Sequence, residues 1–284
     1  GRMATALSFK TPEKYSVTKK LRCDCVQFLL NLHGGRLDSR GGERVIEIGC
    51  GVGDVTSQCF LPLLPKNFKK LTLTDLSPKM LEYTKEEFKE ITNVDVMQMD
   101  IGGEIDANLL GSYDKVFSTF CINYVADQQR VFENVHNLLA PGGECLLILS
   151  ITSSFFEPAF HLMNTPKWKE HLKKYRDVFV FPYREDVQPE RTVRNLLESI
   201  GFRDVFVKKD DFNGNLDLDF YRATLNCLPD FPNTMSKEEK EEFIEDEIKL
   251  GISFNAIADC RNESIPVAYP SMENLIIHAK KAKN

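Results

Sequence analysis

The sequence predicts an α/β fold in which parallel strands alternate with helices. Three observations support this prediction. Short apolar runs alternate with helix-like segments through the first half of the 284-residue chain. A glycine-rich turn, residues 49–53, follows the first apolar run directly. A Pro-Gly-Gly sequence at residues 141–143 ends a helical segment and leads into another apolar run, as expected before a buried strand.

The predicted strands cover Val45–Ile48, Lys70–Asp75, Asp95–Met99, Tyr113–Ser118, Glu144–Ser150, Asp204–Val207 and Asn274–Ala279. Helices are predicted for Pro12–His33, a segment beginning at Ser77-Pro78, a segment ending before Pro141, Pro189–Ser199, Leu216–Leu228 and Ser236–Leu250. At Ser77-Pro78 a capping hydroxyl precedes a proline, which suits the first turn of a helix.

The turn after the first strand has the character of a cofactor turn. Its glycines allow positive φ and let the backbone approach a ligand closely. A dinucleotide fingerprint would need glycine where this chain has Asp54, which disfavours an NAD-dependent reductase, and no Gly-Lys-Ser/Thr follows to form a P-loop. Glu47, two residues before the first glycine, suits a nucleoside cofactor that carries an ammonium group and no pyrophosphate.

Asp75 closes the second predicted strand, 26 residues after Gly49. At that place a ribose would present its two hydroxyls, and one carboxylate can accept a hydrogen bond from each.

The acid-x-Gly-x-Gly-x-Gly pattern resembles the first motif of S-adenosylmethionine-dependent methyltransferases of the seven-stranded α/β class. The resemblance implies a Rossmann-like seven-stranded sheet, a helical cap and S-adenosylmethionine as cofactor, with no metal. It implies that the methionine part, the ribose, the adenine and the sulfonium region are contacted in chain order by Glu47, Gly49, Cys50, Gly51, Asp75, Leu76, Asp100, Ile101, Thr119 and Phe120. A ring face at Phe120 can favour a cation.

Further segments resemble the juvenile hormone acid O-methyltransferase family of arthropods. They are the glycine turn, Leu61-Pro62-Leu63-Leu64-Pro65, Thr74–Tyr83, Met99–Gly102, Ser118–Val125, Asn137–Gly143 and Lys167-Trp168. The resemblance runs from about Tyr15 to the C-terminus and implies methylation of the carboxylate of a sesquiterpenoid acid. It implies an acceptor pocket, and we expect Asn123, Tyr124 and Trp168 to line it.

Two positions depart from the family pattern. The family tends to read Cys-Leu-His-Trp where this chain has Cys121-Ile122-Asn123-Tyr124, and a glutamine expected in the first helix is replaced near Leu21. Both places would lie near the transferring methyl. The sequence therefore leaves two alternatives open: a small-molecule N-methyltransferase, and a catalytically silent regulatory protein that binds a cofactor or a lipophile.

The chain is predicted to divide into an N-terminal cap helix (1–34), a cofactor-binding core (35–150), and a substrate cap plus the last two core strands (151–284). The third region is rich in rings, which favours an apolar acceptor pocket. These rings are Phe155, Phe156, Phe160, Trp168, Tyr175, Phe179, Phe181 and Tyr183.

Composition restricts the possible partners. The net charge is −6 and the pI about 5.5, which argues against a nucleic-acid substrate. No apolar run is long enough to span a bilayer, and the eight cysteines show no metal-ligand spacing. We expect no signal-like leader. We expect a cytoplasmic protein, monomeric or homodimeric, that acts on a small lipophilic acid without a nucleic-acid or membrane partner.

The five histidines do not form a catalytic site by spacing. A carboxylate acceptor has an ordinary pKa near 4 and is already ionised at neutral pH, so its methylation needs orientation and no base.

Overall fold

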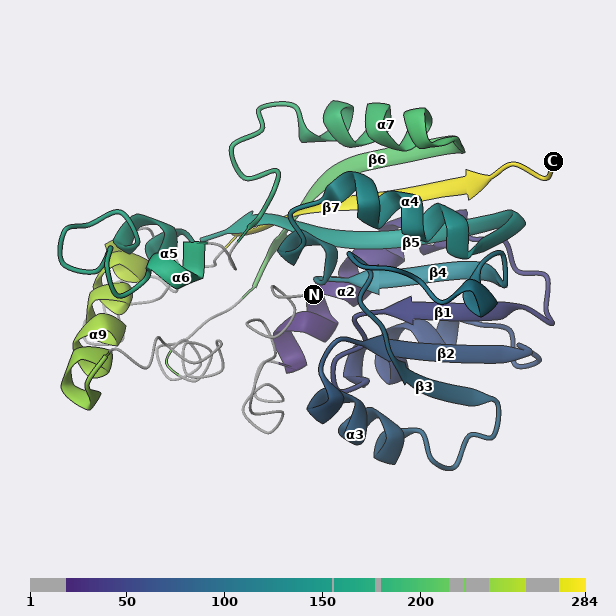
Figure 1. The fold of residues 1–284 in the computed structure, drawn as a ribbon, viewed down its shortest axis with the longest axis horizontal. Coiled ribbons are helices and arrows are strands. Elements are labelled where there is room, and N and C mark those ends of the chain that lie inside the picture. The colour runs from purple at the N-terminus through teal and green to yellow at the C-terminus, as the bar shows by residue number, and fades with distance from the viewer. Residues whose placement is uncertain (1–18, 155, 177–179, 215–221, 223–234, 254–270) are drawn as a thin grey trace.

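The computed structural model describes residues 19–154, 156–176, 180–214, 222, 235–253 and 271–284. Its centre is a seven-stranded sheet in the order β3-β2-β1-β4-β5-β7-β6 (Figure 1). The strands are β1 Arg44–Ile48, β2 Lys70–Asp75, β3 Val94–Gln98, β4 Tyr113–Thr119, β5 Leu139–Ser153, β6 Phe202–Asn213 and β7 Ser271–Lys281. Strand β7 is antiparallel to β5 and β6, and the pairs among β1 to β5 are parallel. The predicted α/β, Rossmann-like sheet is confirmed.

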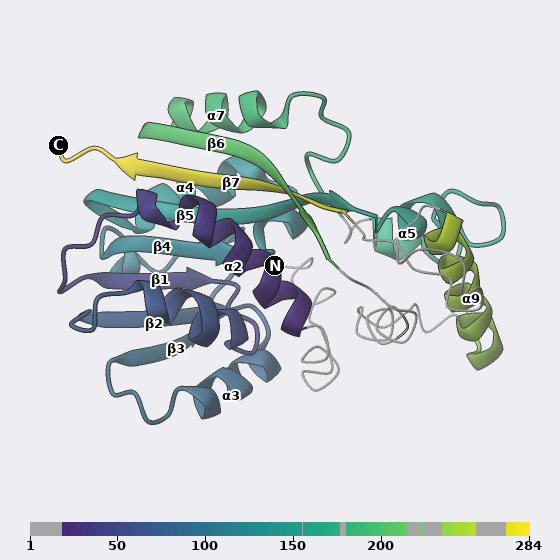
Figure 2. The same ribbon diagram turned by 180° about the vertical axis from the view of Figure 1, so that it is seen from behind.

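The described residues also form helices. They are α2 Lys19–His33, α3 Pro78–Glu87, α4 Gln128–Leu138, α5 Glu157–Leu162, α6 Lys173–Arg176, α7 Pro189–Ile200 and α9 Lys237–Ser253. Figures 1 and 2 show α4 and α7 on one face and α2 on the other. Short helical turns connect the elements at Gly34–Arg36, Thr56–Phe60, Leu61–Leu63, Ala107–Leu109 and Ile122–Tyr124.

Two hydrophobic cores follow from the alternation of side chains along the strands. On β1, Ile46 and Ile48 pack with the α4 and α7 side chains, whereas Val45 packs with α2. Glu47 shares the α2 face with Val45, so a carboxyl group lies within an otherwise apolar layer. The position of α2 over this face is what brings it to the glycine turn.

A smaller lobe extends beyond the carboxyl end of β5 and contains α5, α6 and α9 (Figure 1). It has its own cluster of buried apolar side chains, formed mainly by α5, the segment that follows it and α9. Trp168 and Phe243 belong to this cluster, with their rings 5.2 Å apart at 80°. We refer to this lobe, together with α2, as the cap.

Several boundaries differ from those predicted. Strand β5 begins directly after α4, at Leu139, and the Pro-Gly-Gly segment forms an irregular start to it, since Gly142 has φ +80° and donates to Ala282 O at 3.2 Å. Strands β6 and β7 are longer than predicted because their charged ends pair with each other at the edge of the sheet. The predicted helical residues 12–18 and most of 216–228 lie outside the described residues.

Within the described part of the chain, none of the helices combines the length and the apolar character required to cross a bilayer.

Candidate active site

The glycine turn joins β1 to the helical turn at Thr56 and lies at the carboxyl edge of the parallel strands. Gly49, Gly51 and Gly53 have φ of +70°, +58° and +85°. A Cβ on Gly49 would lie 2.4 Å from Cys121 Sγ, and one on Gly53 would lie 2.8 Å from Phe88. Glycine is therefore required at both places, by backbone conformation and by the close approach of neighbouring segments.

Glu47 lies beneath this turn and is 1% exposed. Its Oε2 accepts a hydrogen bond from Thr56 Oγ1 at 2.5 Å, while Oε1 has no partner in the described structure. Burial raises the pKa of Glu47 to about 8, with smaller upward contributions from the nearby carboxylates of Asp54 and Asp75 and an opposing one from the Thr56 hydrogen bond. Glu47 thus offers a buried acceptor to a donor that is not part of the protein, such as the ammonium group of an amino acid.

Asp75 ends β2 beside the turn. Its Oδ2 accepts from Gly51 N and its Oδ1 from Ser77 N, both at 2.9 Å. Burial raises the pKa of Asp75, and these backbone bonds oppose that shift. Each carboxylate oxygen retains a second acceptor position, so a vicinal diol such as a ribose fits the arrangement.

The predicted adenine residues follow β3. Asp100 Oδ1 accepts from Gly102 N at 2.9 Å, and Ile101 is 4% exposed against the core. Leu76, at the end of β2, is half-buried, and its carbonyl accepts from Gln98 Nε2 at 2.9 Å. The structure brings these residues to the same edge as Asp75, and their contacts with adenine stay a prediction.

The segment after β4 contacts the glycine turn directly, through Cys121 and Gly49. Thr119 is buried, and Phe120 takes φ +51°, a conformation that a non-glycine residue adopts only under constraint. Phe120 N donates to Ile148 O at 2.9 Å, which fixes this kink on β5. Cys50 is buried in the turn, with its Sγ near Thr84 Oγ1 at 3.8 Å.

Asn123 follows in the turn Ile122–Tyr124 and is 1% exposed. Its Oδ1 accepts from Ser150 N at 3.3 Å, which joins the turn to β5. That nitrogen, Nδ2, is buried without a partner in the residues described, as is the hydroxyl of Ser150. Two hydrogen-bond donors therefore lie on neighbouring residues close to the glycine turn. The sequence predicts Asn123 as a site residue and does not point to Ser150, and a role for either in binding the acceptor stays a prediction.

Aromatic residues of the cap contact Asn123 and Tyr124. Phe181 N donates to Asn123 O at 3.1 Å, and the Phe181 ring lies 5.5 Å from the Tyr124 ring and 4.9 Å from that of Phe156. Trp168 is 2% exposed within the cap, and its Nε1 donates to Asp246 at 2.8 Å. Tyr124 thus borders both the turn and the cap, and an acceptor contact by Trp168 stays a prediction.

The other predicted ring residues are divided between regions. Phe160 packs on Phe181 at 5.4 Å within the cap cluster, whereas Tyr183 packs in the core beneath α4 and donates to Gln128 Oε1 at 3.1 Å. Phe155, Phe179 and the side chain of Tyr175 lie outside the described residues.

Arg22 is a residue that sequence reasoning missed. It projects from α2 and forms a buried ion pair with Asp54, the residue after the last glycine of the turn. The two are 32 positions apart in the sequence, and no motif links them. The pair joins the cap helix to the glycine turn.

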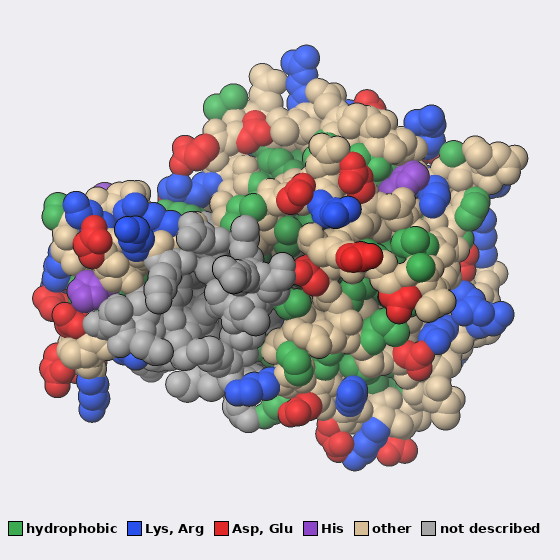
Figure 3. Space-filling model, viewed as in Figure 1, with side chains coloured by type: hydrophobic (Ala, Val, Ile, Leu, Met, Phe, Trp, Pro, Cys, Tyr) green, Lys and Arg blue, Asp and Glu red, His purple; other side chains and the backbone are tan. Residues whose placement is uncertain are grey.

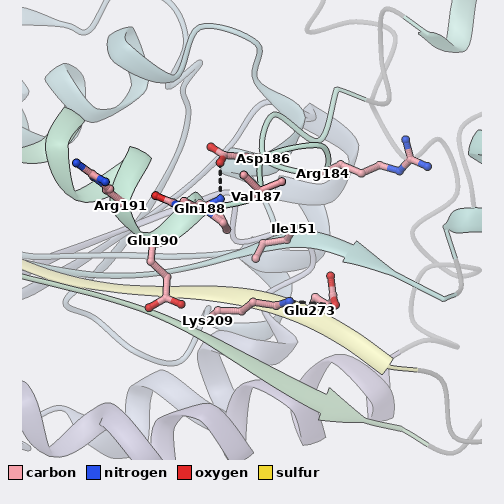
Figure 4. Close-up of a pocket in the computed structure, with 10 residues that line it drawn as sticks. Ile151, Arg184, Asp186, Val187, Gln188, Glu190, Arg191, Lys209 and Glu273 are labelled. Atoms are coloured by element: carbon pink, nitrogen blue, oxygen red, sulfur yellow. Dashed lines mark hydrogen bonds and ion pairs between the residues drawn. The ribbon is translucent and has the colours of Figure 1, made fainter.

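A cavity of ≈ 600 Å³ lies elsewhere, at the end of β5 beside the start of α7 (Figure 4). Ile151, Glu190 and the ion pair of Lys209 with Glu273, at 3.1 Å, contribute to its lining, and the Asp186 carboxylate accepts from Gln188 N at 2.8 Å. The predicted site residues do not line it. On the face drawn in Figure 3, basic and acidic side chains are intermixed over the described surface.

The residues at the carboxyl edge fit S-adenosylmethionine. The unpartnered Oε1 of Glu47 matches its ammonium group, and Asp75 matches its ribose diol. When bound, this cofactor supplies a methyl group on a positively charged sulfur.

Comparisons with known proteins agree with this fit. A family model for a methyltransferase domain matches residues 46–145. Juvenile hormone acid O-methyltransferase of Bombyx mori is 30% identical over 244 residues, covering 84% of this chain and 86% of its own length. The protein of the same name from Drosophila melanogaster is 27% identical over 231 residues, covering 79% and 76%.

Solved structures share the fold. YcgJ of Bacillus subtilis aligns with a TM-score of 0.56 at 17% identity, covering 90% of this chain and 98% of its own. Phosphoethanolamine N-methyltransferase 2 of Haemonchus contortus, solved with phosphomonomethylethanolamine and S-adenosylhomocysteine, aligns with a TM-score of 0.52 at 20% identity, covering 89% and 52%. The sequence identities and coverage, together with the site, lead to one assignment. The chain belongs to the juvenile hormone acid O-methyltransferase family and is an S-adenosylmethionine-dependent methyltransferase.

Proposed function

We propose that this enzyme transfers the methyl group of S-adenosylmethionine to the carboxylate of a lipophilic acid of the sesquiterpenoid type. The names of its relatives support this substrate class. The observation that carries the proposal is the pair of buried donors formed by Asn123 Nδ2 and Ser150 Oγ.

A carboxylate is complementary to these two donors. A buried amide or hydroxyl left without a hydrogen bond costs roughly 1 to 3 kcal/mol. Two such donors, on two residues that are hydrogen-bonded to each other, therefore favour a ligand that accepts from both. Each carboxylate oxygen can do so, and an ionised acceptor strengthens both bonds. An ammonium or amine ligand would instead face donors at this place.

The acceptor's hydrocarbon chain would extend from these donors toward the cap. Tyr124, Phe156 and Phe181 lie in contact there, at the junction of the turn and the cap. Aromatic and apolar side chains form most of the lining of small-molecule pockets, and each methylene they bury contributes about 0.8 kcal/mol. This arrangement selects for a long apolar acid over a short polar one.

The proposed chemistry requires orientation and the exclusion of water. A carboxylate oxygen is nucleophilic as it stands at neutral pH, because its ordinary pKa is near 4. Asn123 and Ser150 would aim one oxygen at the methyl group, and such alignment can contribute on the order of 7 to 11 kcal/mol to lowering the barrier. The cap rings would keep competing water away.

The test uses acceptors that share one branched hydrocarbon chain and differ only in their end group: carboxylic acid, primary amine, alcohol or phenol. Each is incubated with methyl-labelled S-adenosylmethionine, and the label in organic-soluble product is counted. We expect label in the acid. Label in the amine alone would assign N-methylation, and cofactor binding without label in any acceptor would favour a regulatory binding protein.

A further inference from the structure

We propose that Arg22, on the cap helix α2, binds the carboxylate at the amino-acid end of the cofactor, with Asp54 holding the guanidinium in place. The inference concerns the cofactor and does not depend on which acceptor is methylated.

Arg22 lies at the end of the glycine turn. Its side chain is 11% exposed and that of Asp54 is 7% exposed, and the two form an ion pair at the end of the glycine turn. Helix α2 contacts the same region a second time, since Cys59 Sγ lies 3.7 Å from Cys23 O. The guanidinium is therefore held against the turn that receives the methionine part of the cofactor.

Several of the backbone N–H groups of the glycine turn already have acceptors within the protein. A helix N-terminus or a glycine turn often binds an anion through its N–H groups. Here four of those groups already donate within the protein: Cys50 N to Thr74 O, Gly51 N to Asp75, Gly53 N to Cys50 O, and Val55 N to its neighbour Asp54. These four groups are not available to a cofactor carboxylate, which favours a donor from a side chain.

The charges around the glycine turn also favour Arg22. The carboxyl groups of Glu47, Asp54 and Asp75 converge on the turn, which suits an ammonium group and repels a carboxylate. Among the described residues, the buried lysine and arginine side chains are Arg22 and Lys115. Lys115 pairs with Glu43 at 2.6 Å near the opposite, amino end of β4. Arg22 is thus the buried cation at the cofactor's end of the sheet.

A guanidinium can serve two carboxylates at once, because its N–H donors point in several directions within one plane. The Asp54 carboxylate accepts a hydrogen bond from Nη2 of the Arg22 guanidinium. The cofactor carboxylate on another side would complete a chain of alternating charges from the turn to α2. Cofactor binding and the docking of the cap helix then become mutually stabilising.

The experiment compares two ligands that differ by one carboxylate: S-adenosylhomocysteine, and its decarboxylated analogue, which keeps the amine. Calorimetry gives the dissociation constant of each for the wild type and for Arg22→Gln. The wild type should bind S-adenosylhomocysteine roughly 10- to 100-fold more tightly than the analogue. In Arg22→Gln that ratio should fall to near one.

Two further variants guard against a structural effect. The double variant Arg22→Gln with Asp54→Asn removes both charges, so it leaves no unpaired buried carboxylate, and its ligand ratio should also be near one. Lys20→Gln, on the exposed face of the same helix, should keep the wild-type ratio. If the Arg22 variants weaken the binding of both ligands by the same factor, or leave the binding of both unchanged, Arg22 acts only on Asp54 and the proposal is wrong.

Discussion

Thr56 Oγ1 and Glu47 Oε2 lie 2.5 Å apart, so the first helical turn after the glycines fixes one oxygen of a buried carboxyl, while the other oxygen has no partner among the described residues. Because burial raises the pKa of Glu47 to about 8, this carboxyl is mostly protonated at neutral pH before the cofactor binds. A cofactor ammonium group needs the ionised form. Binding must therefore lower this pKa and release a proton.

The first prediction is that affinity for S-adenosylhomocysteine rises between pH 6 and pH 7.5, by up to roughly 20-fold. Affinity rises with pH because the free protein must release the Glu47 proton for the ammonium group to bind. The free energy needed to remove this proton falls as the pH approaches 8. Calorimetry in buffers of different ionisation enthalpy measures the proton released. Glu47→Gln should bind more weakly at pH 7.5 and should lose this pH dependence. A wild-type affinity that does not change with pH would refute the role of Glu47.

The second prediction concerns Asp75. Charge-assisted hydrogen bonds are worth roughly 1.5 to 3 kcal/mol each, so Asp75→Ala should weaken cofactor binding at least tenfold without unfolding the protein. Asp95→Asn, a half-exposed carboxylate on β3 that pairs with Lys70, is the matched control. Equal affinities for Asp75→Ala and the wild type would remove the ribose assignment.

The third prediction separates acceptor binding from cofactor binding. Asn123→Asp keeps the shape of the side chain and replaces the unpartnered donor with an oxygen, so it should repel a carboxylate acceptor. We expect kcat/KM for the acid to fall at least tenfold, while S-adenosylhomocysteine affinity stays within twofold. Ser150→Ala should lower kcat/KM in the same direction and less steeply. Full activity of Asn123→Asp toward acids would contradict the carboxylate assignment.

The fourth prediction concerns the cap. Activity at low acceptor concentration should rise with chain length, since each buried methylene contributes up to about 0.8 kcal/mol. Trp168→Ala should flatten this dependence, because it removes a ring that packs on Phe243 inside the cap. Its affinity for the cofactor should not change. If Trp168→Ala keeps the full dependence on chain length, Trp168 is only a packing residue of the cap.

The fifth prediction concerns stability at the far end of the sheet. Lys115 lies between Glu43 at 2.6 Å and Glu144 at 3.3 Å, all nearly fully buried. Burial opposes ionisation of Glu144, but the bond with His278, the charge of Lys115 and the donation from Asp38 N outweigh it and lower its pKa. This stability is present above the ordinary carboxyl pKa and is lost as pH falls through the lowered one.

Lys115→Met should therefore destabilise the fold by about 3 to 5 kcal/mol at pH 7, measured by urea unfolding, because it leaves buried carboxylates unpaired. Lys70→Met removes a partly exposed pair and should cost less than about 1 kcal/mol. A small effect at Lys115 would show that the cluster is solvated.

Local patterns made most of the fold predictable. The turn at Gly49–Gly53 and the acid Asp75 could be identified because a strand, a turn and a helix follow one another within a few residues, and such order is visible in sequence. The ends of β6 could not, because their charged residues become strand only through pairing with β7. Arg22 and Ser150 were missed for a related reason: each acquires its place from a partner that is remote in sequence.

The most direct test of the central claim is the chemical nature of the labelled product. A lipophilic acid is methylated with methyl-labelled S-adenosylmethionine, extracted, and treated with alkali. A methyl ester releases its label as volatile methanol, whereas a methylated amine or ether keeps it. We predict that nearly all of the label is recovered as methanol, and label that remains bound to the acceptor after alkali would contradict carboxyl methylation.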